Sequence, residues 1–245
     1  MATAPSSLAR SPGLAARRER LFFGGMTIAM LVTVLAGFGP TYFFSSVSSS
    51  TVVLTPALHL HGAVFTTWML LLVVQSTLIA AGRVDVHRQL GVAGAVLGAF
   101  MMLLAAYVAI SRMQAGLMAP PPGVPVGVLL AIALATVVVF PVLFGSALLL
   151  RRRTDYHKRL VLLATFELVI AAVARLPGVA AGGPPVFFGI TDLFVVALIV
   201  YDFSTRGRIH PATLWGGLFF IVSQPLRLVI GFSDPWQSFV SWLAS

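Results

Sequence analysis

Residues 57–91, ALHLHGAVFTTWMLLLVVQSTLIAAGRVDVHRQLG, decide how this chain folds. An apolar run fills most of the stretch, and a polar and basic segment, GRVDVHRQL at 82–90, closes it. About 20 apolar residues, each adding about 1.5 Å of helix, cross the ~30 Å hydrocarbon core of a bilayer. The stretch therefore predicts a transmembrane helix followed by a polar loop.

The composition of the whole chain agrees with a membrane location. Of its 245 residues, 58% are hydrophobic and only 9% are charged, and the mean hydropathy is +0.98. Soluble domains carry about 25% charged residues, so this chain has too few polar side chains to cover a water-exposed surface. The sequence predicts an integral membrane protein. Because cysteine is absent, disulfides, thiolate catalysis and cysteine-ligated zinc or iron–sulfur sites are excluded.

Seven apolar runs are separated by segments rich in proline, glycine, serine or basic residues. We expect an all-α bundle of seven transmembrane helices over 21–232, after a disordered basic tail at 1–20. The first run is longer than the core of a signal peptide, so it is expected to remain as a span. Residues 233–245 are expected to form a short amphipathic helix on the outer surface. The runs lie at about 21–43, 57–81, 90–110, 125–150, 160–178, 186–203 and 213–232.

Basic residues set the expected orientation. All of the 16 Lys and Arg residues except Arg112, Arg175 and Arg227 fall in the tail or in the connections after the second, fourth and sixth runs. The positive-inside rule then places the amino terminus in the cytoplasm and the carboxyl terminus outside. Basic residues placed in this way report topology, aided by anionic lipid. The expected partner is therefore the lipid bilayer, and no nucleic-acid partner is expected.

The segment at 82–90 recurs as RRTDYHKRL at 152–160, with Arg, Asp, His and a second basic residue in the same order. Both segments are expected on the cytoplasmic side, so helices 2–3 and helices 4–5 would form a parallel hairpin repeat. In one interpretation each aspartate complements the dipole of the helix that follows. In the other, His87 and His157 lie at equal depth in the two hairpins and share a metal ion or a haem iron.

Polar side chains inside the apolar runs are the candidates for function, because a charged residue there costs about 2.5–3.5 kcal/mol on insertion scales. In one interpretation, Arg175–Asp192 and Glu167–Arg227 are structural ion pairs that lock the last three spans together. In the other, the same residues line a polar cavity that opens to the outside and binds a small anionic ligand. The candidate ligand-binding residues are His61, Trp68, Gln75, Glu167, Arg175, Asp192, Gln224 and Arg227.

The second span contributes three of these candidates. His61, Trp68 and Gln75 recur at seven-residue spacing, so they share one face of the helix, which is expected to point into the bundle. His61 lies in the outer half of the membrane, where its protonation near neutral pH would couple ligand binding to a proton. His59 points about 200° away from His61 on a helix, so these two residues cannot ligate one metal ion.

The chain carries no motif of a known catalytic class. It has no Walker A loop, GxSxG elbow or HExxH sequence, and no nucleophile–base pair is visible, so the sequence does not favour an enzyme. The only lysine, Lys158, lies at a cytoplasmic helix end. A retinal Schiff base within the bundle is therefore excluded.

Several longer motifs resemble those of an uncharacterised bacterial family of multipass membrane proteins. They are HLHGAVFTTW at 59–68, HKRLVLLAT at 157–165, TRGRIHPATLWGG at 205–217 and SQPLR at 223–227. The resemblance covers most of residues 36–232. It implies a helical bundle in the bacterial inner membrane, and it brings no assigned activity and no catalytic residue.

The leading hypothesis is binding or transport of a small ligand, linked to protons, through a polar site in the outer half of the bundle. The alternative hypothesis is a redox protein that binds haem b or a metal, with His61, His87 and His157 as candidate ligands. A third hypothesis is an assembly or scaffold protein that binds no ligand.

Overall fold

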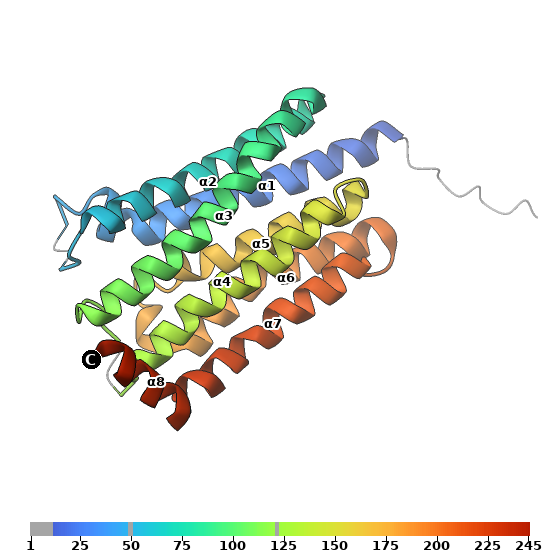
Figure 1. The fold of residues 1–245 in the computed structure, drawn as a ribbon. Helices are drawn as coiled ribbons and strands as arrows, with labels where there is room; N and C mark the ends of the chain where they lie inside the picture. Colours follow the sequence, from blue (N-terminus) through green and yellow to red (C-terminus); the bar gives the residue numbers. More distant parts are fainter. Residues whose placement is uncertain (1–11, 49–50, 121–122) are drawn as a thin grey trace, which may run out of the picture.

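The computed structural model describes residues 12–48, 51–120 and 123–245, and these residues contain helices and no strands (Figure 1). A π-helical segment, η1, continues the first helix, and a short 3-10 turn, η2, precedes the sixth. The elements are α1 Pro12–Phe38, η1 Gly39–Phe43, α2 Pro56–Ala80, α3 Val84–Gln114, α4 Val126–Leu149, α5 Thr154–Val173, η2 Ala180–Gly182, α6 Gly183–Arg206, α7 Pro211–Phe232 and α8 Asp234–Ala244.

Six helices in the described residues are long and apolar enough to cross a membrane. They are α1 together with η1, α2, α3, α4, α6 and α7. The remaining long helix, α5, differs because 4 of its 20 residues are charged: Asp155, Lys158, Arg159 and Glu167. The prediction of an all-α protein with several helices able to span a membrane is therefore confirmed for the described residues, and six of these helices meet the criterion of length and hydropathy.

Helix α5 lies at the centre of the bundle. It packs against α1, α4, α6 and α7, and 13 of its 20 residues are buried. Helices α2 and α3 form a hairpin that bridges α1 and α4 on one side of α5 (Figure 1). This arrangement explains the composition of α5, because a central helix meets protein partners on most of its surface and can keep charged residues that a lipid-facing helix cannot.

Glycines allow the closest helix contacts in the bundle. A Cβ atom on Gly37 would collide with the backbone carbonyl of Ala172, so α1 and α5 touch backbone to backbone at this point. A Cβ atom on Gly231 would lie only 2.9 Å from the Cα atom of Val128, which fixes the approach of α7 to α4. Contacts of this kind favour helix association in lipid, where dispersion between close surfaces replaces the hydrophobic effect.

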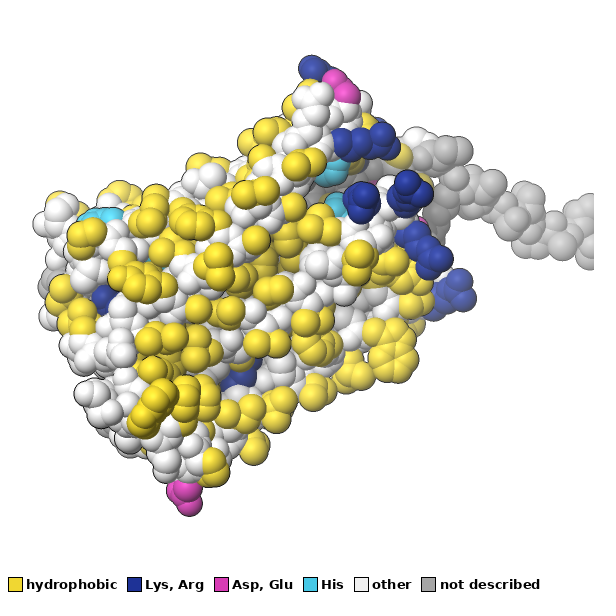
Figure 2. Space-filling view, viewed as in Figure 1, with side chains coloured by type: hydrophobic (Ala, Val, Ile, Leu, Met, Phe, Trp, Pro, Cys, Tyr) yellow, Lys and Arg dark blue, Asp and Glu magenta, His cyan; other side chains and the backbone are white. Residues whose placement is uncertain are grey.

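The basic residues gather at one end of the bundle, where α1 begins (Figure 2). The α2–α3, α4–α5 and α6–α7 connections lie at the same end (Figure 1). We call this the basic end. The opposite end carries the α1–α2, α3–α4 and α5–α6 connections. There α8 packs against α3, α4 and α7, with Val240 buried and the indole N–H of Trp236 donating to the carbonyl of Gly127 at 2.7 Å.

Residues 1–11 of the expected disordered tail lie outside the described residues, but 12–20 form the first turns of α1. This part is rich in Ala, Leu, Arg and Glu, which have high helix propensity. Glu19 also forms an ion pair of 2.8 Å with Lys158, which ties the start of α1 to α5. The expectation of a disordered segment is therefore wrong for residues 12–20.

Candidate functional site

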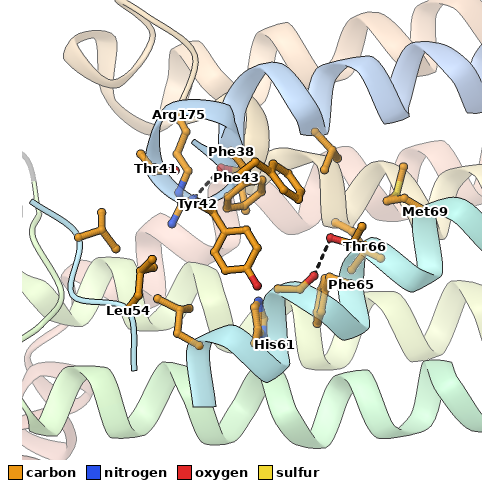
Figure 3. A pocket seen from close by; sticks show the side chains of 16 residues that line it. Phe38, Thr41, Tyr42, Phe43, Leu54, His61, Phe65, Thr66, Met69 and Arg175 are labelled. Atoms are coloured by element: carbon orange, nitrogen blue, oxygen red, sulfur yellow. Dashed lines mark hydrogen bonds between the residues drawn. The ribbon is translucent and has the colours of Figure 1, made fainter. Parts of the chain in front are cut away.

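A cavity of about 110 Å³ lies at the end opposite the basic end, between η1, the start of α2 and the end of α5 (Figure 3). Most of its wall is apolar, with aromatic rings and aliphatic chains from α1, η1 and α2. Five of the lining side chains carry polar groups, and they come from η1, α2 and the segment after α5. The residues that line it include Val34, Phe38, Thr41, Tyr42, Phe43, Leu54, His61, Phe65, Thr66, Met69, Leu168 and Arg175.

Arg175 is the charged group of this cavity. It lies two residues after α5 ends, and its Nη1 atom donates to the carbonyl of Ala171 at 2.6 Å. Its guanidinium carbon lies 4.7 Å from the ring centroid of Phe38, in a cation–π contact. In the described residues no carboxylate lies within 4 Å of it, so its charge has no counter-ion from the protein. The predicted Arg175–Asp192 ion pair is therefore wrong.

Two further polar atoms on the cavity wall lack partners. His61 stacks on Phe65 with ring centroids 4.1 Å apart. Its Nδ1 atom and the hydroxyl of Thr41 are buried, and neither has a hydrogen-bond partner in the described residues. Figure 3 shows His61 and Arg175 reaching the cavity from different segments of the chain. Buried polar groups are normally hydrogen-bonded, so the cavity offers unused hydrogen-bonding capacity beside an unpaired cation.

A second polar group is buried and makes most of its hydrogen bonds within the protein, although the Nε atom of Arg227 has no partner in the described residues. The guanidinium of Arg227 donates to both carboxylate oxygens of Glu167, at 2.8 and 2.7 Å. The Thr136 hydroxyl also donates to this carboxylate at 2.7 Å, and both charged side chains are almost fully buried. This is the Glu167–Arg227 ion pair of the structural interpretation. Neither residue lines the cavity.

Asp192 and Gln224 form a separate contact between α6 and α7. The amide of Gln224 donates to the Asp192 carboxylate at 2.7 Å, and in the described residues no Lys or Arg forms an ion pair with Asp192. Asp192 is therefore the one acidic group of the predicted site that lacks a cationic partner.

The other two candidates on α2 also face different surroundings. Trp68 is buried and packs edge-on against Phe140 and Phe144 of α4, at 5.2 and 5.0 Å between ring centroids. Gln75 donates to the backbone carbonyl of His87 at 3.2 Å. The seven-residue spacing does place these residues on the inward face of α2, but that face meets a different neighbour at each level. The eight candidates therefore occupy several places instead of one site.

The proposed set of metal ligands is also divided. His61 and Gln75 are 14 residues apart on α2, which corresponds to about 21 Å along the helix, and Gln75 contacts His87 at the basic end. His61 therefore cannot share an ion or a haem with His87 and His157. Within the part of the chain that the structure describes, no group of three or more His, Asp or Glu residues is placed to hold a metal.

A buried network at the basic end escaped the sequence reasoning. Arg159 and Asp202, on α5 and α6, form an ion pair and are 1% and 0% exposed. The carboxylate also accepts from the Thr213 hydroxyl at 2.6 Å and from the backbone N–H of His210 at 3.1 Å. From its place after the fourth apolar run, Arg159 is expected to lie in a loop and to report only topology. The sequence contained one signal for this network: Asp202 lies inside an apolar run, where a carboxylate requires a partner.

The chain matches no family model, and it has no match among curated proteins or among solved structures.

Proposed function

We propose that this protein crosses the membrane seven times, with α5 as the additional span, and that the basic end faces the cytoplasm. The length of α5, 20 residues, corresponds to about 30 Å, and the helix is surrounded by α1, α4, α6 and α7. Its buried charges are paired inside the protein by Asp202 and Arg227. The positive-inside rule supports the orientation, and the resemblance noted above supports the bacterial inner membrane.

Our functional proposal is that the cavity at the outer end binds a small organic anion with an apolar tail, as a receptor or transport site. The observation that carries it is the guanidinium of Arg175, an exposed residue without a carboxylate partner in the described residues, at the edge of a mainly apolar cavity. A guanidinium binds a carboxylate through two parallel N–H···O bonds. The free Thr41 hydroxyl and the His61 imidazole are further polar contacts.

The size and lining of the cavity define the ligand class. A dry cavity of about 150 Å³ accepts a benzene molecule, so a cavity of about 110 Å³ suits a short-chain carboxylate of roughly three or four carbon atoms. Its tail would lie against Phe38, Phe65 and Met69, which line the wall. An anion bound beside His61 favours the protonated imidazole, so binding would be linked to proton uptake.

The test uses the detergent-purified protein and a series of straight-chain carboxylates from two to eight carbons, with the matching alcohols as uncharged probes. A ligand at ten times its Kd stabilises the folded state by about 1.4 kcal/mol, which corresponds to a rise in Tm of about 3–6 °C for a chain of this size. We expect this rise for carboxylates of intermediate length and a much smaller one for alcohols.

The deciding variant is Arg175→Gln, which should abolish the rise, whereas Arg175→Lys keeps the charge and should retain part of it. Arg153→Gln at the basic end is the matched control, because it removes one exposed positive charge far from the cavity. If carboxylates stabilise Arg175→Gln as much as the original chain, or if no chain length stabilises the original chain, the proposal is refuted.

A further inference from the structure

The two histidines of the repeated segment come together at the basic end. His87 lies in the first turns of α3 and His157 in the first turns of α5. Their ring centroids are 6.3 Å apart, and the ring planes are nearly perpendicular. Residues 70 positions apart thus meet across the boundary between the α2–α3 and α4–α5 hairpins.

The tautomer of His157 is fixed by its surroundings. Its Nδ1 atom lies 2.9 Å from the carbonyl oxygen of Ala147. Since a carbonyl oxygen only accepts hydrogen bonds, Nδ1 carries the hydrogen and the lone pair of the neutral ring is on Nε2. A backbone carbonyl that holds one ring nitrogen and leaves the other free is the usual support of a metal-binding histidine.

Gln75 brings a third atom that could bind a metal, its amide oxygen, close to His87. Its Nε2 atom donates to the carbonyl of His87 at 3.2 Å, which orients the amide. Its Oε1 atom and the Nδ1 atom of His87 are buried, and neither has a partner in the described residues. Two buried polar atoms without partners on neighbouring side chains indicate that a further group satisfies them.

The positive charges next to His87 and His157 are partly neutralised within the protein. Arg83 lies 3.5 Å from the carboxylate of Asp85, and Lys158 lies 2.7 Å from that of Asp155. The aspartates of the repeated segment therefore lower the positive field beside the histidines.

From this geometry we propose that His87, His157 and Gln75 bind one divalent transition-metal ion of the zinc or copper class. With metal–nitrogen distances of about 2.0–2.1 Å, two imidazole centroids lie about 5 Å apart at a tetrahedral angle and about 6.5 Å apart when the two nitrogens face each other across the ion. The observed 6.3 Å matches nearly opposite imidazoles, as in a tetragonal copper site, and a tetrahedral zinc site requires the two rings to approach by about 1 Å. The amide oxygen is a third ligand, and water completes the coordination, so the site keeps an open position. The proposal is independent of the outer cavity.

The test uses the full chain, purified in detergent with a tag that contains no histidine and stripped with a chelator. Calorimetric titration with Zn²⁺ should show one ion per chain. Substituting His87→Ala or His157→Ala should weaken binding at least 100-fold, and Gln75→Leu should weaken it at least tenfold. His59→Gln, at the other end of α2, is the matched histidine control and should bind Zn²⁺ as the original chain does.

Absence of binding to the original chain, or binding that survives the His87→Ala/His157→Ala double substitution, would overturn the proposal. If the alanine variants do not fold, electron paramagnetic resonance of Cu²⁺ bound to the original chain decides the matter. Hyperfine coupling to two imidazole nitrogens supports the site, and coupling to any other number contradicts it.

Discussion

Replacing Arg227 with methionine is the sharpest test of how the bundle is held together. The substitution keeps an unbranched apolar stem but removes the guanidinium and the charge that faces Glu167. The carboxylate would then lose both hydrogen bonds from the guanidinium, at 2.8 and 2.7 Å, and would keep only the 2.7 Å bond from Thr136. One carboxylate oxygen would have no partner among the described residues.

The expected cost follows from this burial. Both side chains are at most 2% exposed, and breaking a buried ion pair on one side costs about 3–5 kcal/mol, because the remaining charge is left without compensation. The double variant Glu167→Gln/Arg227→Gln removes both charges and can keep an amide–amide hydrogen bond. It should therefore lose less than half as much stability as Arg227→Met.

Reversible unfolding in mixed micelles with increasing SDS, followed by tryptophan fluorescence, gives the free energies. Trp68 is a suitable reporter because it is 4% exposed and packed among core aromatics. A loss of less than about 1 kcal/mol in the free energy of unfolding for Arg227→Met would refute the claim that this ion pair is buried, because ion pairs that contribute so little are exposed to water. So would a double variant that is less stable than the single one.

Two other predictions test the packing and the basic end. Gly37→Val should destabilise the fold strongly, since the new side chain meets the backbone of Ala172, whereas Gly24→Ala has open space and should be neutral in the same unfolding assay. Burial, followed by two nearby guanidinium groups, lowers the pKa of His210, whose ring nitrogen accepts from the backbone N–H of Ala212 at 3.1 Å. The folded state thus favours neutral His210, and stability should fall as the pH drops below about 6.5, where the unfolded chain takes up a proton. His210→Asn keeps a capping acceptor and should reduce this difference in unfolding free energy between pH 5 and 8; an unchanged pH profile would contradict this assignment.

Several helix boundaries could be anticipated from the sequence, but α1, α3 and α5 begin six or more residues before the predicted apolar runs, because their first turns are polar. The predicted run at 57–81 corresponds to α2, Pro56–Ala80. Two other differences have local causes. α6 begins at Gly183, earlier than expected, because Pro184 and Pro185 stand in the first turn, where a missing N–H costs nothing. α5 ends at Val173, earlier than expected, because the proline at 177 disfavours helix in the residues just before it.

The two copies of the repeated segment show which features follow from the local sequence and which depend on tertiary contacts. Its aspartates lie in the first turns of α3 and α5, as helix-dipole arguments predict. The two segments nevertheless have different partners. Asp155 also binds Arg206 at 2.5 Å, while the only ion pair of Asp85 within the described residues is with Arg83. The α4–α5 hairpin lies beside the α6–α7 connection, and the α2–α3 hairpin does not. Comparing the sequences of the two segments cannot reveal this difference.

The sequence by itself determined that this is an all-helical protein with several membrane-spanning helices and basic residues gathered at one end. These properties follow from hydrophobicity and charge along the chain, because a bilayer acts on each segment almost independently. Only the tertiary structure decided which polar groups meet. It paired Glu167 with Arg227 and Arg159 with Asp202, and it left Arg175 unpaired beside a cavity. Such pairings depend on the rotation and depth of each helix against its neighbours, and residue spacing within one helix does not contain that information.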